Sequence, residues 1–158
     1  MQILFNSLLT ISCFFFMEFV AWFTHKYIMH GFMWYFHRDH HLKDHTHRYE
    51  RNDIFFLIFA APAIILIYTG FQSQQWSDYR IWAGLGITLY GIFYLAVHDI
   101  FSHQRLRLLT RTNSKYLNAL RRAHKIHHKN LGKENGSKFG FMFEALPYLK
   151  DERREQSI

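Results

Sequence analysis

Three long apolar runs limit this chain to a narrow set of folds. Residues 1–24 contain no Lys or Arg and one carboxylate, Glu18, while residues 54–71 and 81–97 contain no charged residue. Each run is near the roughly 17–25 residues with which a helix crosses the hydrocarbon core of a bilayer. The first run lacks the basic start and cleavage site of a secretory signal, so we expect it to stay in the mature protein. We therefore predict one all-α domain, 1–158, forming an integral membrane helical bundle of three spanning helices, with a fourth allowed.

The basic residues predict how this bundle lies in the membrane. The link between the second and third runs contains one basic residue, Arg80, whereas residues 25–53 contain five and the chain after Val97 contains thirteen. Cytoplasmic segments next to membrane spans carry an excess of Lys and Arg. We therefore expect 25–53 and 98–147 to lie in the cytoplasm, followed by an uninformative tail. The net charge of +7 then suits an anionic leaflet without requiring nucleic acid.

Twelve histidines lie in these two basic segments, and none lies in the outer link. Two H-x-x-H-H motifs each place three imidazoles on one helix face, because positions i, i+3 and i+4 are neighbours. Two H-x4-H pairs would be about 140° apart on an ideal α-helix. Each pair is therefore expected to straddle a helix end or a kink, with Gly31 as the stop after the first pair. The motif histidines are His25, His30, His37, His40, His41, His98, His103, His124, His127 and His128.

Ten imidazoles in four short motifs indicate metal binding, since neutral imidazole is the commonest metal ligand near pH 7. Because each metal ion takes only a few of these ligands, ten of them favour two metal ions in a histidine-rich cap. The chain lacks the Glu-x-x-His pairs of soluble di-iron bundles, so a carboxylate-bridged centre of that kind is disfavoured. His45 and His47 fall outside the motifs and are expected to be solvated. A single cysteine, Cys13, excludes an internal disulfide.

The motifs HKYIMH, HRDHH, HDIFSH and HKIHH, placed around short membrane spans, resemble those of the membrane-bound fatty acid hydroxylase and sterol desaturase superfamily. Within it, FTHKYIMHGFMWYFHRDHH, YLAVHDIFSHQR and RRAHKIHHKNLGKENGSKFGF are similar to the bacterial β-carotene 3-hydroxylases, and the similarity extends to about Pro147.

The resemblance implies a non-haem di-iron monooxygenase of a bacterial inner membrane. Its reaction would be the O2-dependent hydroxylation of the β-ionone rings of β-carotene at C3 and C3′, which gives β-cryptoxanthin and zeaxanthin. The ten motif histidines would hold two iron ions, which zinc can replace in purified protein because it binds imidazole more tightly than ferrous iron does. The carotenoid would come from the bilayer, and electrons would come from an external ferredoxin-type donor.

Carboxylates close to the motif histidines are candidates for orienting imidazole N–H groups. Asp39 and Asp99 adjoin motif histidines, and Glu18 precedes His25 by seven residues on the same helix face. On the third run, a stripe made mostly of small residues indicates a slot through which one end of a polyene could reach a ligand. The same stripe also suits close helix packing. Its residues are Gly84, Thr88, Gly91 and Leu95.

Other functions stay open on the sequence alone. A di-iron hydroxylase or desaturase acting on a fatty acyl, sphingoid or sterol lipid would use the same site. A metal-binding or metal-transport protein would place ligands in the middle of its spans, where these runs contain no histidine. A bis-histidine haem protein would need only two of the histidines for each haem.

Overall fold

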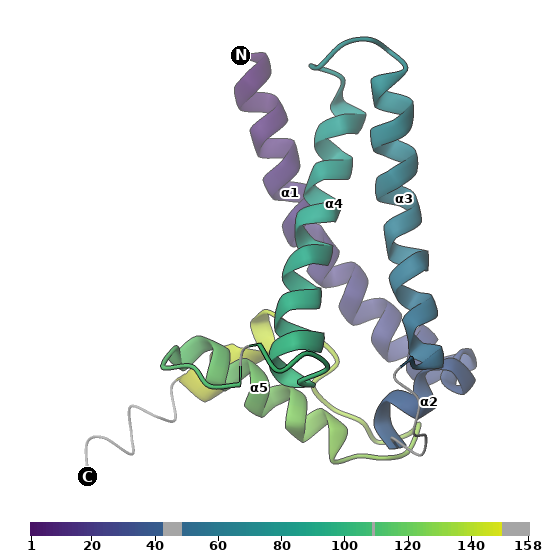
Figure 1. Cartoon of the computed structure of the whole chain (residues 1–158), viewed down its shortest axis with the longest axis vertical. Helices are drawn as coiled ribbons and strands as arrows, with labels where there is room; N and C mark the ends of the chain where they lie inside the picture. The colour runs from purple at the N-terminus through teal and green to yellow at the C-terminus, as the bar shows by residue number, and fades with distance from the viewer. Residues whose placement is uncertain (43–48, 109, 150–158) are drawn as a thin grey trace.

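The chain folds into a helical column with a cap of shorter helices at one end (Figure 1). The computed structural model describes residues 1–42, 49–108 and 110–149, and within these ranges it contains no strand. In chain order the elements are α1 (Gln2–Phe23), η1 (Thr24–Phe32), α2 (Trp34–Leu42), η2 (Arg51–Asp53), α3 (Ile54–Phe71), α4 (Tyr79–Tyr94), η3 (Leu95–Ser102), α5 (Lys115–His128) and η4 (Phe143–Ala145). The prediction of an all-helical membrane bundle with a histidine-rich end is confirmed.

Three helical stretches of the described chain are long and apolar enough to cross a membrane: Gln2–Phe32, Arg51–Phe71 and Tyr79–Ser102. Many of their large apolar side chains face outward, with Phe16 61% and Ile64 65% exposed. Contiguous apolar surface of this extent is unfavourable in water and favourable against lipid chains. The column is therefore the membrane-embedded part of a membrane protein.

Glycines allow α4 to lie close to both neighbouring spans. A Cβ at Gly84 would come within 2.7 Å of Ile67 and 3.0 Å of the carbonyl oxygen of Ala63, both on α3. A Cβ at Gly86 would overlap the carbonyl oxygen of Thr10 on α1. Small residues of this kind let membrane helices pack backbone to backbone. The middle helix α4 is thus fixed against α1 on one side and α3 on the other.

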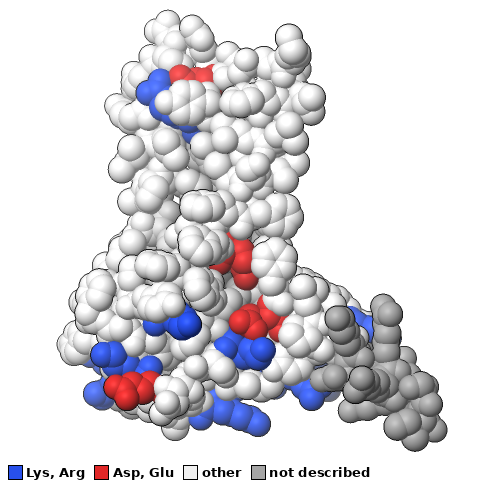
Figure 2. All heavy atoms as spheres, turned by 180° about the vertical axis from the view of Figure 1, so that it is seen from behind, with Lys and Arg blue, Asp and Glu red and all other residues white. Residues whose placement is uncertain are grey.

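Charged side chains are sparse along the column and gather over the cap, apart from a small group at the column's far tip (Figure 2). At the start of α4, in the link after α3, the carboxylate of Asp78 accepts hydrogen bonds from the backbone N–H and the guanidinium of Arg80, each at 2.9 Å. Asp78 therefore caps α4 and neutralises the one basic residue of this link.

An apolar cluster fastens α5 to the end of the third span. The hydroxyl of Ser114 caps α5 by accepting from the backbone N–H of Leu117. The buried face of the helix then packs on η3 and on the segment that follows α5. The cluster consists of Val97, Phe101, Ala119, Leu120, Phe141 and Ala145. This packing sets the position of the histidines that α5 carries.

Candidate metal centre

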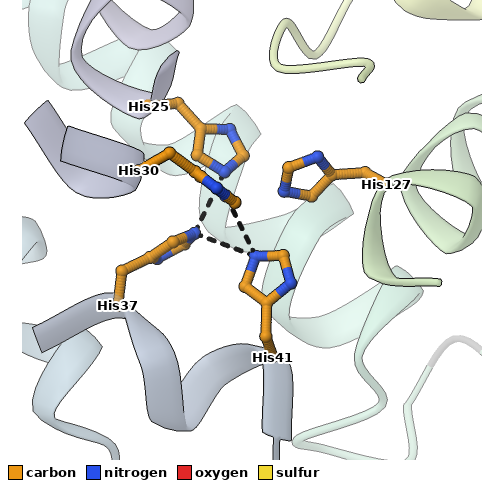
Figure 3. Close-up of side chains that lie close together, drawn as sticks. All are labelled: His25, His30, His37, His41 and His127. Atoms are coloured by element: carbon orange, nitrogen blue, oxygen red, sulfur yellow. Dashed lines mark hydrogen bonds between the residues drawn. The ribbon is translucent and has the colours of Figure 1, made fainter. Parts of the chain in front are cut away.

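Five histidines from three elements point toward a common centre at the capped end of the column (Figure 3). One ring nitrogen of each lies within 4.8 Å of the corresponding nitrogens of the others. We call this group cluster A; its members are His25 and His30 of η1, His37 and His41 of α2, and His127 of α5.

A second group of four histidines, cluster B, meets the same distance criterion. Its members are His40 of α2, His98 of η3, His103 just after η3, and His124 of α5. The tenth motif histidine, His128, lies between the two clusters, with its ring centroid 4.4 Å from that of His41 and 4.4 Å from that of His124. The structure therefore brings all ten motif histidines together.

The two H-x4-H pairs converge because the helices widen at these positions. Both η1 and η3 are π-helical, and a π-helix bonds residue i to residue i+5. The backbone N–H of His103 donates to the carbonyl of His98 at 2.9 Å, so one widened turn joins that pair. The ring centroids lie 4.7 Å apart in this pair and 5.2 Å apart in the pair His25 and His30.

The sequence predicted a helix end or kink for each pair, and the structure confirms a helix end for the second pair and places the kink of the first pair directly after His30. The first pair lies inside a widened turn, and the second runs from such a turn to the end of its helix. The predicted stop at Gly31 is present, with non-helical φ −102° and ψ −125° directly after His30.

Each H-x-x-H-H motif contributes to both clusters. On α2, His37 and His41 face cluster A while His40 faces cluster B. On α5, His127 belongs to cluster A and His124 to cluster B. The two clusters are therefore side by side, with α2 and α5 shared between them.

Seven of the ten imidazoles have Nδ1 within 2.6–3.1 Å of an oxygen outside the clusters. The acceptors are the backbone carbonyls of Phe139 for His25, Lys133 for His30, Asn130 for His41 and Ser137 for His127, and the side chains of Asn52 for His37, Glu50 for His40 and Asp99 for His98. These oxygens only accept, so each Nδ1 carries the proton and each neutral ring presents an Nε2 lone pair.

The inward nitrogens approach one another without protons to share. Nε2 of His37 lies 3.1 Å from Nε2 of His25 and 3.2 Å from Nε2 of His41, and the latter lies 3.2 Å from Nε2 of His30. With every Nδ1 in this set protonated, these contacts join lone pairs and cannot be hydrogen bonds between neutral rings. A cation placed among them converts repulsion into coordination, so the donor set fits a metal ion.

Burial strengthens this fit, because Nε2 of His40, His127 and His128 is buried without a hydrogen-bond partner in the described chain. Burial lowers the pKa of His127 to about 4 and, with the neighbouring His127 and His30, that of His41 to about 3. Burial and adjacent imidazoles also lower the pKa of His40 and His124. Neutral imidazole is the form that binds metal, and it suits iron, zinc, copper or nickel.

Asn52 and Glu50 are functional candidates that the sequence analysis missed. Glu50 is the N-cap of the short turn η2 and Asn52 lies within it, directly before the second apolar run. Asn52 holds His37 at 2.6 Å, and Glu50 holds His40 at 2.7 Å. The turn is locked by a capping box in which the carboxylate of Asp53 accepts from the backbone N–H of Glu50 at 3.1 Å. The four consecutive polar residues 50–53, directly before the apolar run 54–71, were the sequence signal that could have revealed them.

Of the carboxylates predicted to orient histidines, Asp99 contacts one. Its Oδ1 lies 3.1 Å from Nδ1 of His98. Asp39 is buried and accepts a hydrogen bond of 2.6 Å from the backbone N–H of Arg51, which fixes the start of η2. The roles predicted for both residues stay predictions. His45 and His47 lie outside the described residues.

Glu18 is buried at 4% exposure and ties three parts of the chain together. It accepts a hydrogen bond of 2.8 Å from the hydroxyl of Tyr90 on α4 and one of 2.7 Å from the backbone N–H of Phe141. The carbonyl that holds His25 belongs to Phe139, two residues earlier. Glu18 therefore positions the backbone next to cluster A through the segment 139–141, with no histidine among these partners.

A cavity of about 290 Å³ lies between α1, α3 and α4. Its lining includes His25 and His37 of cluster A and His98 of cluster B. Most other lining side chains are apolar, such as Phe55 and Phe59 on α3. The cavity therefore connects the membrane-embedded column with both histidine clusters.

The stripe predicted on the third span divides between two roles. Thr88, Gly91 and Leu95 line the cavity, and a Cβ at Gly91 would meet nothing within 4 Å. Gly84 packs against α3 and is not part of the lining. Three of the four residues therefore line the cavity and Gly84 serves helix packing, while the substrate role of the stripe stays a prediction.

The fatty acid hydroxylase family model matches residues 10–149 of this chain. The chain is 41% identical to a β-carotene hydroxylase of Pseudescherichia vulneris over 145 residues, which covers 90% of this chain and 78% of that protein. It is 41% identical to a β-carotene hydroxylase of Pantoea ananas over 134 residues, covering 85% and 74% of the two chains. It is 34% identical to one of Paracoccus sp. (strain N81106 / MBIC 01143) over 139 residues, covering 87% and 83%. No solved structure matches it. The resemblance predicted from the histidine motifs is confirmed.

Proposed function

Because this chain belongs to the fatty acid hydroxylase family and its named relatives indicate an oxygenase, we propose that it hydroxylates the β-ionone rings of β-carotene at C3 and C3′. The products would be β-cryptoxanthin and then zeaxanthin. The observation that carries the proposal is the cavity between the three spans, because its lining reaches histidines of both clusters. A hydrocarbon substrate could enter it from the bilayer and meet the reactive centre without crossing water.

Clusters A and B would each hold one iron ion. Iron bound there would activate O2, a reaction that no amino-acid side chain can perform. The imidazoles contribute by staying neutral in their buried surroundings, and their Nδ1 hydrogen bonds keep each Nε2 aimed inward. His128, between the clusters, is available to either ion.

The size of the cavity favours one end of a long substrate. Sites that enclose a whole small molecule measure roughly 300–1,000 Å³. At about 290 Å³ this cavity suits a single ring, with the polyene extending along the spans into lipid. The open face of Gly91 would admit the ring, and the phenylalanines of α3 would exclude water from it.

Arg105 supports the polar end of the cavity. Its Nη1 lies 2.7 Å from Asp53 and 3.8 Å from Asp99. Asp99 contacts His98, so the guanidinium links the turn η2 to the histidine-bearing end of the third span. We assign Arg105 a positioning role: it holds two elements that orient cluster B.

The cap is proposed to face the cytoplasm of a bacterial inner membrane, with a ferredoxin-type protein as the electron donor. Support comes from the single basic residue in the link between the second and third apolar runs and the eighteen others outside it. Reporter fusions in the 72–78 link and after residue 149 would test the orientation. They should report opposite sides, with the fusion after residue 149 in the cytoplasm.

The function is tested by expressing the chain in a host that accumulates β-carotene and separating the pigments by chromatography. We expect new 3-hydroxylated pigments that disappear in His40→Ala and His127→Ala at equal protein levels. His45→Ala, outside the motifs, is the matched control and should retain the products. Unaltered β-carotene together with new hydroxylated or desaturated lipids would favour the lipid-oxidising alternative.

A further inference from the structure

A basic stripe runs along the outer face of α5. Arg122, Lys125 and Lys129 follow one another at intervals of three and four residues, which places them on one side of the helix. All three are exposed, and within the described part of the chain no carboxylate forms an ion pair with any of them. We call these three residues the α5 stripe.

The opposite face of the same helix carries one histidine of each cluster. His124 and His127 each lie two positions from a stripe residue, which is about 200° around an α-helix of 3.6 residues per turn. His124 belongs to cluster B and His127 to cluster A. Only the thickness of one helix, about 10–12 Å with side chains, therefore separates the basic surface from both clusters.

The proposed reaction needs electrons at these clusters. Hydroxylation follows the balance R–H + O2 + 2 e⁻ + 2 H⁺ → R–OH + H2O, in which O2 is reduced and the C–H bond is oxidised. The chain has one cysteine, so it cannot ligate a cysteine-bound iron–sulfur cluster that would store electrons. The two electrons would therefore reach the histidine clusters from a source other than such a cluster, and a separate carrier protein is one such source.

We propose that the α5 stripe is the docking surface for an acidic, water-soluble one-electron carrier protein, which delivers electrons through α5 to both clusters. This inference rests on the proposed oxygenase function. Charge complementarity favours such a partner, because a cluster of positive charges without carboxylate partners in the described residues attracts and orients a negatively charged protein. A carrier bound at the α5 stripe would lie about one helix diameter from either cluster.

The orientation of α5 favours a soluble protein over lipid head groups. The buried face packs through Ala119 and Leu120 on Val97 and Phe101 at the end of the third span. The α5 stripe lies on the other side of the helix and is turned away from the column, and Figure 2 shows Lys and Arg on the cap surface far from the column's tip. Lipid head groups surround the spans, whereas a soluble carrier approaches the cap from water.

The test compares Lys125→Glu/Lys129→Glu with the control Arg107→Glu/Arg111→Glu, which makes the same change in charge at exposed positions before α5. Each protein is placed in nanodiscs of neutral phosphatidylcholine. Binding of a negatively charged [2Fe–2S] ferredoxin is titrated directly, and turnover is then measured against ferredoxin concentration. Turnover with a small-molecule reductant and the metal content are measured in parallel.

We expect the stripe variant to bind ferredoxin about tenfold more weakly or worse, within the 10- to 1,000-fold range of electrostatic steering. Its KM for ferredoxin should rise in step, with turnover on the small reductant and metal content unchanged. Wild-type binding should weaken as salt increases, and that of the stripe variant should change less. Equal ferredoxin binding by stripe variant and control would overturn the proposal.

A loss of affinity for phosphatidylglycerol vesicles with ferredoxin binding intact would instead assign the α5 stripe to lipid. The direct titration of ferredoxin binding needs no carotenoid turnover. Failure of the docking proposal is therefore distinguishable from failure of the proposed function. Wild-type protein that binds ferredoxin but leaves β-carotene unaltered would contradict the function and keep the docking surface.

Discussion

Gly91 offers the sharpest test of the cavity as the substrate site. An added Cβ at this position meets no atom within 4 Å, so a larger side chain extends into the cavity of about 290 Å³. Truncating a buried leucine to alanine leaves a void on the order of 100–150 Å³. Gly91→Leu should therefore fill roughly a third to a half of the available space without disturbing helix packing.

Forcing a ring into the reduced space resembles overpacking of a protein core, which costs about 1–3 kcal/mol. Applied to the transition state, this cost lowers kcat/KM roughly 5- to 150-fold, at 1.36 kcal/mol for each factor of ten. Gly91→Ala should have a smaller effect than Gly91→Leu. The assay is pigment chromatography of purified protein in nanodiscs, normalised to folded, metal-loaded protein.

Gly84→Ala is the matched control on the same helix. Its Cβ would press against the carbonyl oxygen of Ala63 at 3.0 Å, so the variant should unfold at a lower temperature while each folded molecule keeps its activity. Full activity in Gly91→Leu, or equal losses per folded molecule in both variants, would refute the assignment of the cavity.

Three further predictions concern the cap. Asn52→Leu removes the acceptor of His37 and should weaken metal binding 10- to 100-fold in a chelator competition, whereas Asn52→Asp keeps an acceptor and should bind nearly as wild type. The metal-free protein should be most stable above pH 6.5 and should lose stability progressively as the pH falls toward 4. Burial lowers the pKa of His127 to about 4 in the folded protein, so below pH 6.5 the unfolded chain binds a proton that the folded protein does not bind. Thermal unfolding in detergent between pH 8 and 4.5 measures this, and a flat profile would contradict it. Removal of metal by a chelator should abolish hydroxylation, iron should restore it, and zinc should bind without restoring it; recovery with zinc would exclude a redox role for the metal.

The sequence was sufficient to predict the three apolar spans and the gathering of the ten motif histidines at one end of them, for identifiable reasons. Uncharged runs of membrane length have few alternatives to a helix, and H-x-x-H-H places three imidazoles on one face of any helix. The division of each motif between two clusters was not predictable, because it depends on how α2 and α5 are placed between the spans. The same limit applies to Gly84 and Gly91, which share a stripe in sequence but meet different neighbours once α3 is in place.

Main-chain groups account for most of what sequence reasoning missed. Four Nδ1 acceptors are carbonyls between Asn130 and Phe139, and a carbonyl is present whatever the residue type. The π-helical turns were missed for a related reason. On a regular α-helix, residues five apart diverge by about 140°, so the sequence indicated that His25 and His30 need a break from that geometry but not that the break is a widened turn.

The central claim is that the two histidine clusters each hold one metal ion. The most direct measurement is quantitative elemental analysis of active protein, comparing wild type with His127→Ala in cluster A and His124→Ala in cluster B. Two ions per chain in the wild type, and close to one in each folded variant, are the predicted results. Active wild-type protein with at most one ion per chain, or variants that keep both ions, would contradict it.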